Sequence, residues 1–135
     1  MTTTETRYKL LIMFLTPEDP AEFERRWAEE FVPLAERLPG LRRVVVGRTH
    51  GGPAGPVAVH LVHELHFDDF EALRAAMRSE AGVAAGQCLV KMAGKRVTLA
   101  FAEHMEDSPA SPQRHEEVKR HEENLSHEPY KGTLL

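Results

Sequence analysis

The chain has 135 residues, of which 41% are hydrophobic and 28% are charged, and its formal net charge at pH 7 is -4. This length and apolar content suit one domain with a single modest core. The charged residues are scattered without a basic stripe, so nucleic acid is not an expected partner. One cysteine, Cys88, excludes an internal disulfide.

The location that we expect from the sequence is the cytoplasm, with no membrane partner. The first residues lack the long apolar core of a signal peptide, and a single cysteine fits a reducing compartment. The longest apolar runs, such as residues 10–15, are far shorter than the roughly 20 residues that cross a bilayer.

The first predicted elements are a strand and a helix. Residues 8–15 form a short apolar run that ends in a cluster of turn residues, which is typical of a buried strand. Thr16 or Asp19 can cap the helix that follows, and Pro39-Gly40 ends it. Apolar residues recur along one face of this helix: Phe23, Trp27, Phe31, Leu34 and Leu38.

A strand pair follows. Residues 41–49 carry three consecutive valines, and residues 57–67 form the longest of the later apolar runs. The glycine-rich residues 51–56 between them join two strands and do not lead into a helix, so we interpret them as a hairpin loop and not as a phosphate-binding loop.

The last predicted elements are a second helix and a fourth strand. Asp68 or Asp69 can cap the helix, and its stripe continues towards Val83 after a break near Gly82. Residues 97–101 alternate between apolar and small or polar side chains, which indicates a strand covered on one side. The stripe of the helix consists of Phe70, Leu73, Ala76 and Met77.

This order predicts an α+β fold of the ferredoxin-like βαββαβ type, with an antiparallel sheet and both helices on one face. Residues 57–67 are apolar at both phases of the strand alternation, so the face without helices should also be buried. A homodimer that closes over the bare faces would bury it. The domain should span residues 7–104, and residues 105–135 form a polar extension that could dock as a short helix on the domain or its dimer mate.

Three segments together resemble the EthD-like family of the dimeric α/β-barrel superfamily: FERRWAEEFVPLAERLPGLRR from Phe23, HELHFDDFEALRAAMRSEAG from His63, and VTLAFAE from Val97. The resemblance covers roughly Lys9 to Glu103. It implies the dimeric ferredoxin-like fold, and it implies a group associated with the degradation of ethers and other xenobiotics.

The polar site of that family is where this sequence departs from the pattern. The resemblance places the family's two histidines at Arg26 and Phe31, its aspartate at about Cys88 and its first-strand tyrosine at Phe14. Only the aromatic place between the histidines is kept, by Trp27. An acid–base mechanism through those histidines therefore has no support in this chain.

The third strand carries the remaining candidates for catalysis. With a period of two, His60, Val62, Glu64 and His66 share the face that looks into the dimer cavity, and His63 lies on the helix-covered face. Glu64, which matches a glutamate of the family, could act as an acid or base beside His60 or His66, or could simply pair with a basic neighbour. Neighbours about 7 Å apart do not converge on one ion, so we expect no metal and no other cofactor.

The other site candidates surround this row. Arg26 could hold an anionic or enolate oxygen through its fork of donors, or could be a solvated helix charge. Trp27 could line the pocket or belong to the core. Cys88 is a weak candidate for a nucleophile and is more often a small buried residue. The residues predicted to contact a ligand are Trp27, Phe14, Phe31, Val62 and Cys88.

Two functions follow from these observations. The first is a small-molecule enzyme or binder that takes an apolar or aromatic compound into the barrel cavity of a homodimer. The second is a non-catalytic dimeric binding or accessory protein, which the loss of the family's histidines, aspartate and tyrosine favours. A pocket that contains Glu64 together with Arg26 or a histidine would support the first.

Overall fold

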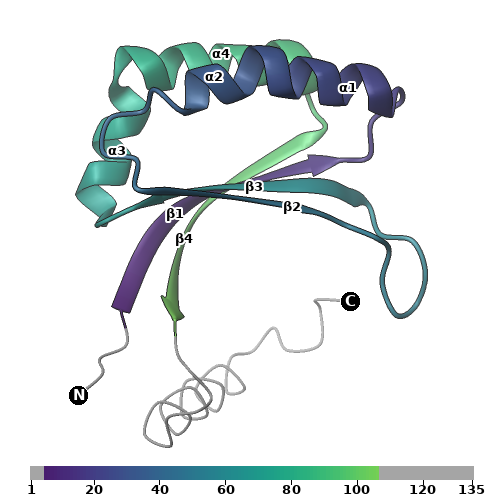
Figure 1. Ribbon diagram of the computed structural model, residues 1–135, viewed down its shortest axis with the longest axis horizontal. Helices are drawn as coiled ribbons and strands as arrows, with labels where there is room; N and C mark the ends of the chain where they lie inside the picture. The colour runs from purple at the N-terminus through teal and green to yellow at the C-terminus, as the bar shows by residue number, and fades with distance from the viewer. Residues whose placement is uncertain (1–4, 107–135) are drawn as a thin grey trace, which may run out of the picture. The chain divides into compact units, whose positions relative to one another are not determined.

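The computed structural model describes residues 5–106, with side chains from Arg7 onward, and shows a four-stranded sheet with helices on one side (Figure 1). The strand order is β2-β3-β1-β4, and β1 and β2 each pair antiparallel with β3. This topology confirms the predicted ferredoxin-like α+β fold. The elements are β1 (Glu5–Leu15), α1 (Pro20–Arg26), η1 (Trp27–Phe31), α2 (Val32–Ala35), β2 (Arg43–Arg48), β3 (Val59–Phe67), α3 (Phe70–Arg78), α4 (Glu80–Ala93) and β4 (Val97–Glu106).

The described residues divide between two compact units. One unit spans Arg7–Glu103 and holds the helices and most of the sheet, and the remaining described residues, 5–6 and 104–106, belong to the other. The short helix predicted for the C-terminal extension lies outside the described residues. Within residues 5–106, none of the helices combines the length and apolar character that a membrane crossing needs.

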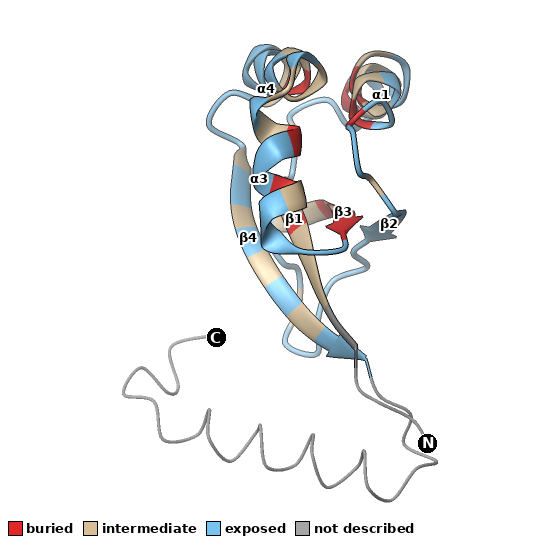
Figure 2. Cartoon of the chain, turned by 90° about the vertical axis from the view of Figure 1, so that its left-hand side faces the viewer, coloured by how far each residue is buried: buried red, intermediate tan, exposed pale blue. Residues whose placement is uncertain are grey.

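The core lies between the helices and the covered face of the sheet, where the buried residues of both layers meet (Figure 2). Leu10, Ile12 and Phe14 of β1 pair with Leu65, His63 and Leu61 of β3. Because side chains alternate across a strand, all six point towards the helices. The largest fully buried side chains are Phe14, Phe31, Phe67, Ile12, Leu61, Leu65, Leu73 and His63.

The first helical segment contains a wider turn. Asp19, just before the first residue of α1, is the cap of this helix, because its carboxylate accepts a hydrogen bond from the Glu22 amide at 3.2 Å. Thr16 is not the cap. In η1 the Val32 amide donates to the Trp27 carbonyl, five residues back. Pro33 has no amide to donate, and its ring would crowd the carbonyl four residues back, so a widened turn accommodates it.

This segment ends earlier than the apolar stripe predicts. Regular helix stops at Ala35, and tight turns follow, with the Arg37 and Leu38 amides each donating to the carbonyl three residues back. Leu38 still reaches the core from this turn and is 5% exposed. Gly40 then adopts a positive φ of 80°, which a glycine accepts without strain.

The second helical segment is split at Ser79. α3 is capped by Asp69, whose carboxylate accepts the Ala72 amide at 2.8 Å, so Asp69 and not Asp68 is the cap. The backbone of Ser79 is extended, and its hydroxyl accepts the Gly82 amide at 3.0 Å and so caps α4. The break that was expected near Gly82 is therefore confirmed, three residues earlier in the chain.

The expected continuation of the stripe to Val83 is wrong. Val83 is 51% exposed, because the break at Ser79 starts a new helix that turns another face to the sheet. Ala85 and Leu89 supply the buried side of α4 instead. Between β2 and β3 the glycine-rich residues form the predicted hairpin loop, in which Gly52 and Gly55 bridge one another.

The close packing of the two helices at the break depends on Gly82. A β-carbon there would collide with the Ala76 carbonyl oxygen and lie 2.7 Å from the Met77 carbonyl oxygen. We expect Gly82→Ala to lower the free energy of unfolding by about 1–3 kcal/mol. Gly86→Ala is the matched control, since nothing lies within 4 Å of its β-carbon, and it should raise stability by about 0.5–1 kcal/mol. Urea unfolding measures both, and a Gly82→Ala variant as stable as the parent would contradict the packing.

Candidate functional site

Glu64 and His66 lie on the sheet face that carries no helices, as predicted. A Glu64 carboxylate oxygen is 3.0 Å from the Lys9 ammonium nitrogen and 2.8 Å from His66 Nε2. Lys9 comes from β1, directly opposite His66 in the sheet register. Lys9 was not among the predicted site residues, although its place in the alternation of β1 puts it on this face.

The charge state of Glu64 follows from these partners. Partial burial raises the pKa of Glu64, but the hydrogen bonds and charges of Lys9 and His66 together outweigh it and hold that pKa below its usual value. Glu64 is therefore a carboxylate at neutral pH and an acceptor in an ion pair. This supports the interpretation in which Glu64 pairs with basic neighbours.

His60 does not share this face, which corrects the sequence-based assignment. The β1–β3 register shifts between Phe14, opposite Leu61, and Leu15, opposite Val59, so His60 is the extra residue of a bulge. A bulge redirects the side chain that it inserts. The His60 ring meets the Phe23 ring of α1 edge-on, with 5.6 Å between centroids.

Glu24 of α1 joins the helix to the bulge. One carboxylate oxygen is 2.7 Å from the Arg48 guanidinium of β2, and the other is 3.1 Å from His60 Nε2. The hydrogen bond from Arg48 is the largest cause of a lowered pKa at Glu24, partial burial opposes it, and His60 adds to it. This polar cluster was not predicted, because its members are 24 and 36 residues apart in the sequence.

Trp27 and His63 form a buried pair next to this cluster, and the Arg48 guanidinium carbon lies 5.6 Å from the Trp27 ring centroid. The Trp27 indole N–H donates to His63 Nδ1 at 3.1 Å, and His63 is 1% exposed, on the covered face as predicted. The rings of Trp27 and Phe31 both meet the imidazole edge-on. Burial lowers the pKa of His63 to about 4, so the imidazole is neutral at physiological pH.

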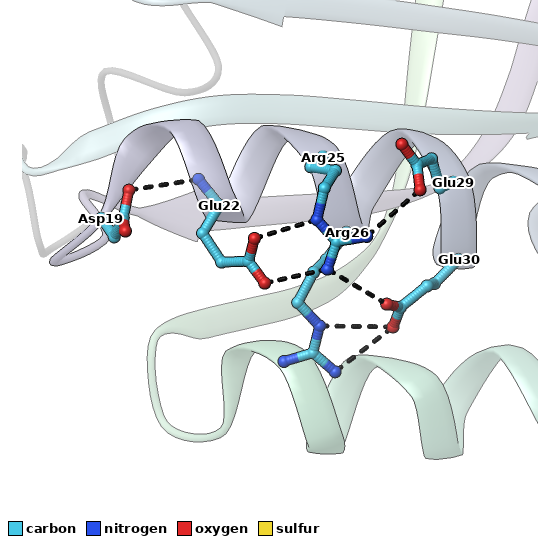
Figure 3. Close-up of polar contacts among 6 residues, drawn as sticks. All are labelled: Asp19, Glu22, Arg25, Arg26, Glu29 and Glu30. Atoms are coloured by element: carbon cyan, nitrogen blue, oxygen red, sulfur yellow. Dashed lines mark hydrogen bonds and ion pairs between the residues drawn. The ribbon is translucent and has the colours of Figure 1, made fainter.

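Arg26 lies on the wall of an open groove of about 300 Å³ between the start of α1 and the end of α4. Figure 3 shows its side chain reaching towards the neighbouring helix, and its Nε donates to Glu30, four residues further along its own helical segment, at 3.3 Å. Arg96 is a second guanidinium on the groove. The apolar part of the lining comes from Leu15, Pro17, Phe23, Met92 and Ala93.

Three carboxylates also border the groove, and each already has a partner. Asp19 caps α1, Glu18 pairs with Arg96 at 2.9 Å, and Glu22 pairs with Arg25 at 2.9 Å (Figure 3). The two arginines keep further N–H donors beyond these pairs, since a guanidinium carries five. The groove therefore combines an apolar lining with positively charged donors.

Arg26 and Phe31, where the resemblance places the family's histidines, lie at the two ends of the wide turn: Arg26 precedes η1 and Phe31 is its last residue. Turns of this kind inside helices are frequent at functional sites. Phe31 is 1% exposed and packs edge-on against Phe14, with 6.3 Å between ring centroids. It also borders an apolar cavity of about 60 Å³ between α4 and the sheet, together with Leu65, Gly82 and Leu99.

The sheet separates the predicted site residues into two groups. Glu64, His66 and Val62 lie on the open face, whereas Arg26, His60 and the aromatic residues lie on the covered face. The ion pair that the sequence allowed between Glu64 and Arg26 is therefore absent. Trp27 and Phe14 are core residues, at 8% and 0% exposure.

Neither Cys88 nor a cluster of metal ligands adds a reactive group to the described residues. Cys88 is half-buried in α4, and burial raises the pKa of its thiol, with Glu30 adding to the effect and Arg26 opposing it. The thiol is thus protonated at neutral pH and is a poor nucleophile. Within residues 5–106, no three His, Cys, Asp or Glu side chains are placed to hold one metal ion.

Comparison with known families and structures identifies the class of protein. The EthD domain model matches residues 15–93, more than half of the sequence, and the chain therefore belongs to the EthD domain family. An ethyl tert-butyl ether D (EthD) family protein from Bacillus halodurans C-125, whose crystal structure is known, is 37% identical in sequence to this chain. That match covers 73% of this chain and 99% of the other, with a TM-score of 0.71.

A second sequence relative and a second solved structure are more distant, and the structure supports the same fold. An uncharacterized 11.0 kDa protein in the thcB-thcC intergenic region of Rhodococcus erythropolis is 25% identical over 96 residues, which are 71% of this chain and 93% of that protein. A dimeric ferredoxin-like protein of unknown function from Jannaschia sp. CCS1 is 19% identical, with a TM-score of 0.53, over 72% of this chain and 97% of the other. The family resemblance predicted from the sequence is confirmed.

The neutral, buried His63 makes stability depend on pH. The folded protein holds His63 unprotonated down to about pH 4, whereas the unfolded chain takes up that proton near pH 6.5. The unfolded state therefore binds more protons between these values, and acidification from pH 8 to pH 5 should cost about 2 kcal/mol through this residue.

Urea unfolding of the parent and of His63→Gln at pH 8 and pH 5 measures this contribution. Glutamine keeps an acceptor for the Trp27 indole but does not titrate, so the variant should lose about 2 kcal/mol less on acidification than the parent. The same pH dependence in both proteins would show that His63 is not the titrating group.

Proposed function

We propose that this EthD-family protein binds a small apolar or aromatic compound that carries an oxygen acceptor, in the groove between α1 and α4. The observation that carries the proposal is the position of Arg26, which stands where the family places a histidine and lines the groove of about 300 Å³. That volume lies at the lower end of the range for small-molecule sites.

The chemistry of the groove defines the class of ligand. Leu15, Phe23 and Met92 offer an apolar surface to a ring or alkyl group. Arg26 and Arg96 can donate hydrogen bonds to a carbonyl, phenolate or carboxylate oxygen, and a charged donor strengthens each bond. Such donors also stabilise an enolate, so a reaction through that intermediate belongs to the proposal.

His60 is the proposed acid–base group for such a reaction. Its ring contacts Phe23, which lines the groove, and its Nε2 is paired with the Glu24 carboxylate. A carboxylate partner orients an imidazole. Glu64 and His66, on the opposite face of the sheet, are assigned to the contact between subunits in this proposal.

The assembly that we propose is a homodimer closed over the open sheet faces. Leu11, Met13, Val45 and Val62 are half-buried on that face, and no helix of the described chain covers them. A second copy would bury these side chains, and a twofold arrangement is the commonest way to do so. The dimeric barrel that the family resemblance implies supports the same arrangement.

A non-catalytic binding or accessory role is the second candidate. It is favoured by the replacement of both family histidines with residues that have other contacts, because Phe31 is packed into the core and Arg26 is paired with Glu30. Neither side chain exchanges protons at neutral pH. In this case the groove holds a ligand without turnover, and a compound that binds there is recovered unchanged.

Arg26→Gln tests the groove, with Arg25→Gln as the matched control. Arg25 is the next residue on the same helix, is bound to Glu22 and Glu29, and does not line the groove (Figure 3). We expect Arg26→Gln to weaken the binding of acetophenone and benzoate about tenfold, because a charged hydrogen bond is lost. The affinity for ethylbenzene should not change. Arg25→Gln should bind all three compounds as the parent does.

Calorimetric or NMR titration with these compounds measures the affinities. If Arg26→Gln weakens the binding of ethylbenzene as much as that of the oxygenated compounds, the variant has altered the shape of the groove and has not simply lost a hydrogen bond. If neither the parent nor the control variant binds any of the compounds, or if Arg26→Gln binds the oxygenated ones as tightly as the parent, the proposed site is wrong.

Val62→Asp tests the homodimer, with Val83→Asp as the matched control. An unpaired carboxylate in the closed interface would cost several kcal/mol, so Val62→Asp should shift the protein from dimer to monomer. Val83 is 51% exposed on the outer side of α4, so its substitution should leave the dimer intact. Light scattering gives the mass of each variant, and a Val62→Asp dimer as stable as the parent would contradict the interface.

A further inference from the structure

A hollow of about 410 Å³ lies beside the edge strand β4, away from the groove of the proposed function. It is lined by Tyr8 of β1, Phe70 at the start of α3, and Phe101, Ala102 and Glu103 of β4. Phe70 is 38% exposed and Phe101 is 54% exposed. Large aromatic side chains that gather and stay exposed in this way mark a binding surface.

The three rings form inclined walls of this hollow. The Tyr8 and Phe70 centroids are 6.1 Å apart with 47° between ring planes, and the Phe70 and Phe101 centroids are 5.5 Å apart at 80°. Because no two of these rings are stacked face to face, an edge-on contact covers one face of one ring and leaves the other faces free. Several inclined rings around one space are the arrangement that holds an organic cation.

The charge at the hollow has the sign that a cation needs. Glu103 lies close enough to the Tyr8 hydroxyl to raise the pKa of Tyr8, first through a side-chain hydrogen bond and then through its charge. Asp69 adds a smaller effect in the same direction. A single phenol donor leaves the carboxylate with further acceptor sites, so Glu103 can also face a positive ligand.

One ring of the hollow already meets a cation of the protein itself. The Arg74 guanidinium carbon is 5.8 Å from the Phe70 ring centroid, and the same guanidinium is paired with Glu71 at 3.4 Å. Arg74 does not line the hollow. The positive charge beside Phe70 is therefore paired with Glu71, and none of the described residues that line the hollow is a cation that could pair with Glu103.

We propose that Tyr8, Phe70, Phe101 and Glu103 form a binding site for a methylated ammonium compound. Methyl groups on nitrogen spread the charge over an apolar surface, which suits the ring faces, and the carboxylate balances the charge. A small metal ion would need several oxygen ligands, and a neutral apolar ligand would bury Glu103 without an opposite charge. The rings lie on the helix-covered side, so a dimer that closes over the open faces leaves the hollow accessible.

Choline and its neutral isostere 3,3-dimethyl-1-butanol separate charge from shape. Titration of the full-length protein, followed by NMR, should show saturable binding of choline at least tenfold tighter than that of the alcohol. Glu103→Gln should weaken choline about fivefold or more without changing the affinity for the alcohol. Phe101→Leu should weaken the binding of both ligands. Glu36 is an exposed carboxylate outside the hollow, so Glu36→Gln should change the affinity for neither.

Several results would overturn the site. Equal affinity for choline and the alcohol would make the hollow an apolar surface, and unchanged choline binding in Glu103→Gln would remove the carboxylate from the site. If the parent protein shows no saturable binding of choline, the proposed site does not exist. The melting temperature of each variant should lie within a few degrees of that of the parent, which shows that a loss of binding is not caused by unfolding. The outcome is independent of Arg26, so this test and the test of the groove can fail separately.

Discussion

The structure depends on the unequal covering of one sheet. Four strands present two faces, and all described helices lie on one of them (Figure 1). Burial of apolar surface between the layers is the main source of stability, so the covered face takes the phenylalanines and leucines. The open face keeps a mixture of half-buried aliphatic side chains and the ion pairs of Glu64. Every candidate residue belongs to one face, and this division decides which of them can act together.

Strand alternation predicted most of that division and failed at one residue. His63, Glu64 and His66 lie on the faces that a period of two assigns to them, because β3 is regular from Leu61 onward. His60 is the exception. The bulge that redirects it arises from pairing with β1, and no local pattern in residues 57–67 signals a change in pairing. The helix caps were predictable for the opposite reason, since Asp19 and Asp69 bind amides only three residues away.

The candidate site itself was less predictable than the fold. Glu24, Arg48 and His60 meet only because α1 crosses the ends of β2 and β3, and the groove beside Arg26 depends on how closely α1 approaches the end of α4. Sequence spacing does not contain these distances. Pro33 was visible as a feature of the family resemblance, but its effect on the backbone, the wide turn between Arg26 and Val32, required the structure.

The chemistry at the two family histidine positions has changed in kind. A histidine exchanges protons near neutral pH, whereas arginine only donates hydrogen bonds and phenylalanine only packs. The position occupied by Arg26 can therefore bind and polarise an oxygen but cannot move a proton. Any proton transfer at this groove has to come from another residue. Glu18, Asp19 and Glu22 border the groove, and His60 contacts its wall through Phe23.

The two ligand regions of the covered face differ in the sign of what they offer. The groove presents the N–H donors of Arg26 and Arg96, which select an oxygen acceptor. The hollow presents ring faces and the carboxylate of Glu103, which select a cation. Carboxylates border both regions, so net charge alone does not separate them. Under the two proposals a single protomer binds two ligands of different character at separate places, because guanidinium donors line the groove and several aromatic rings line the hollow.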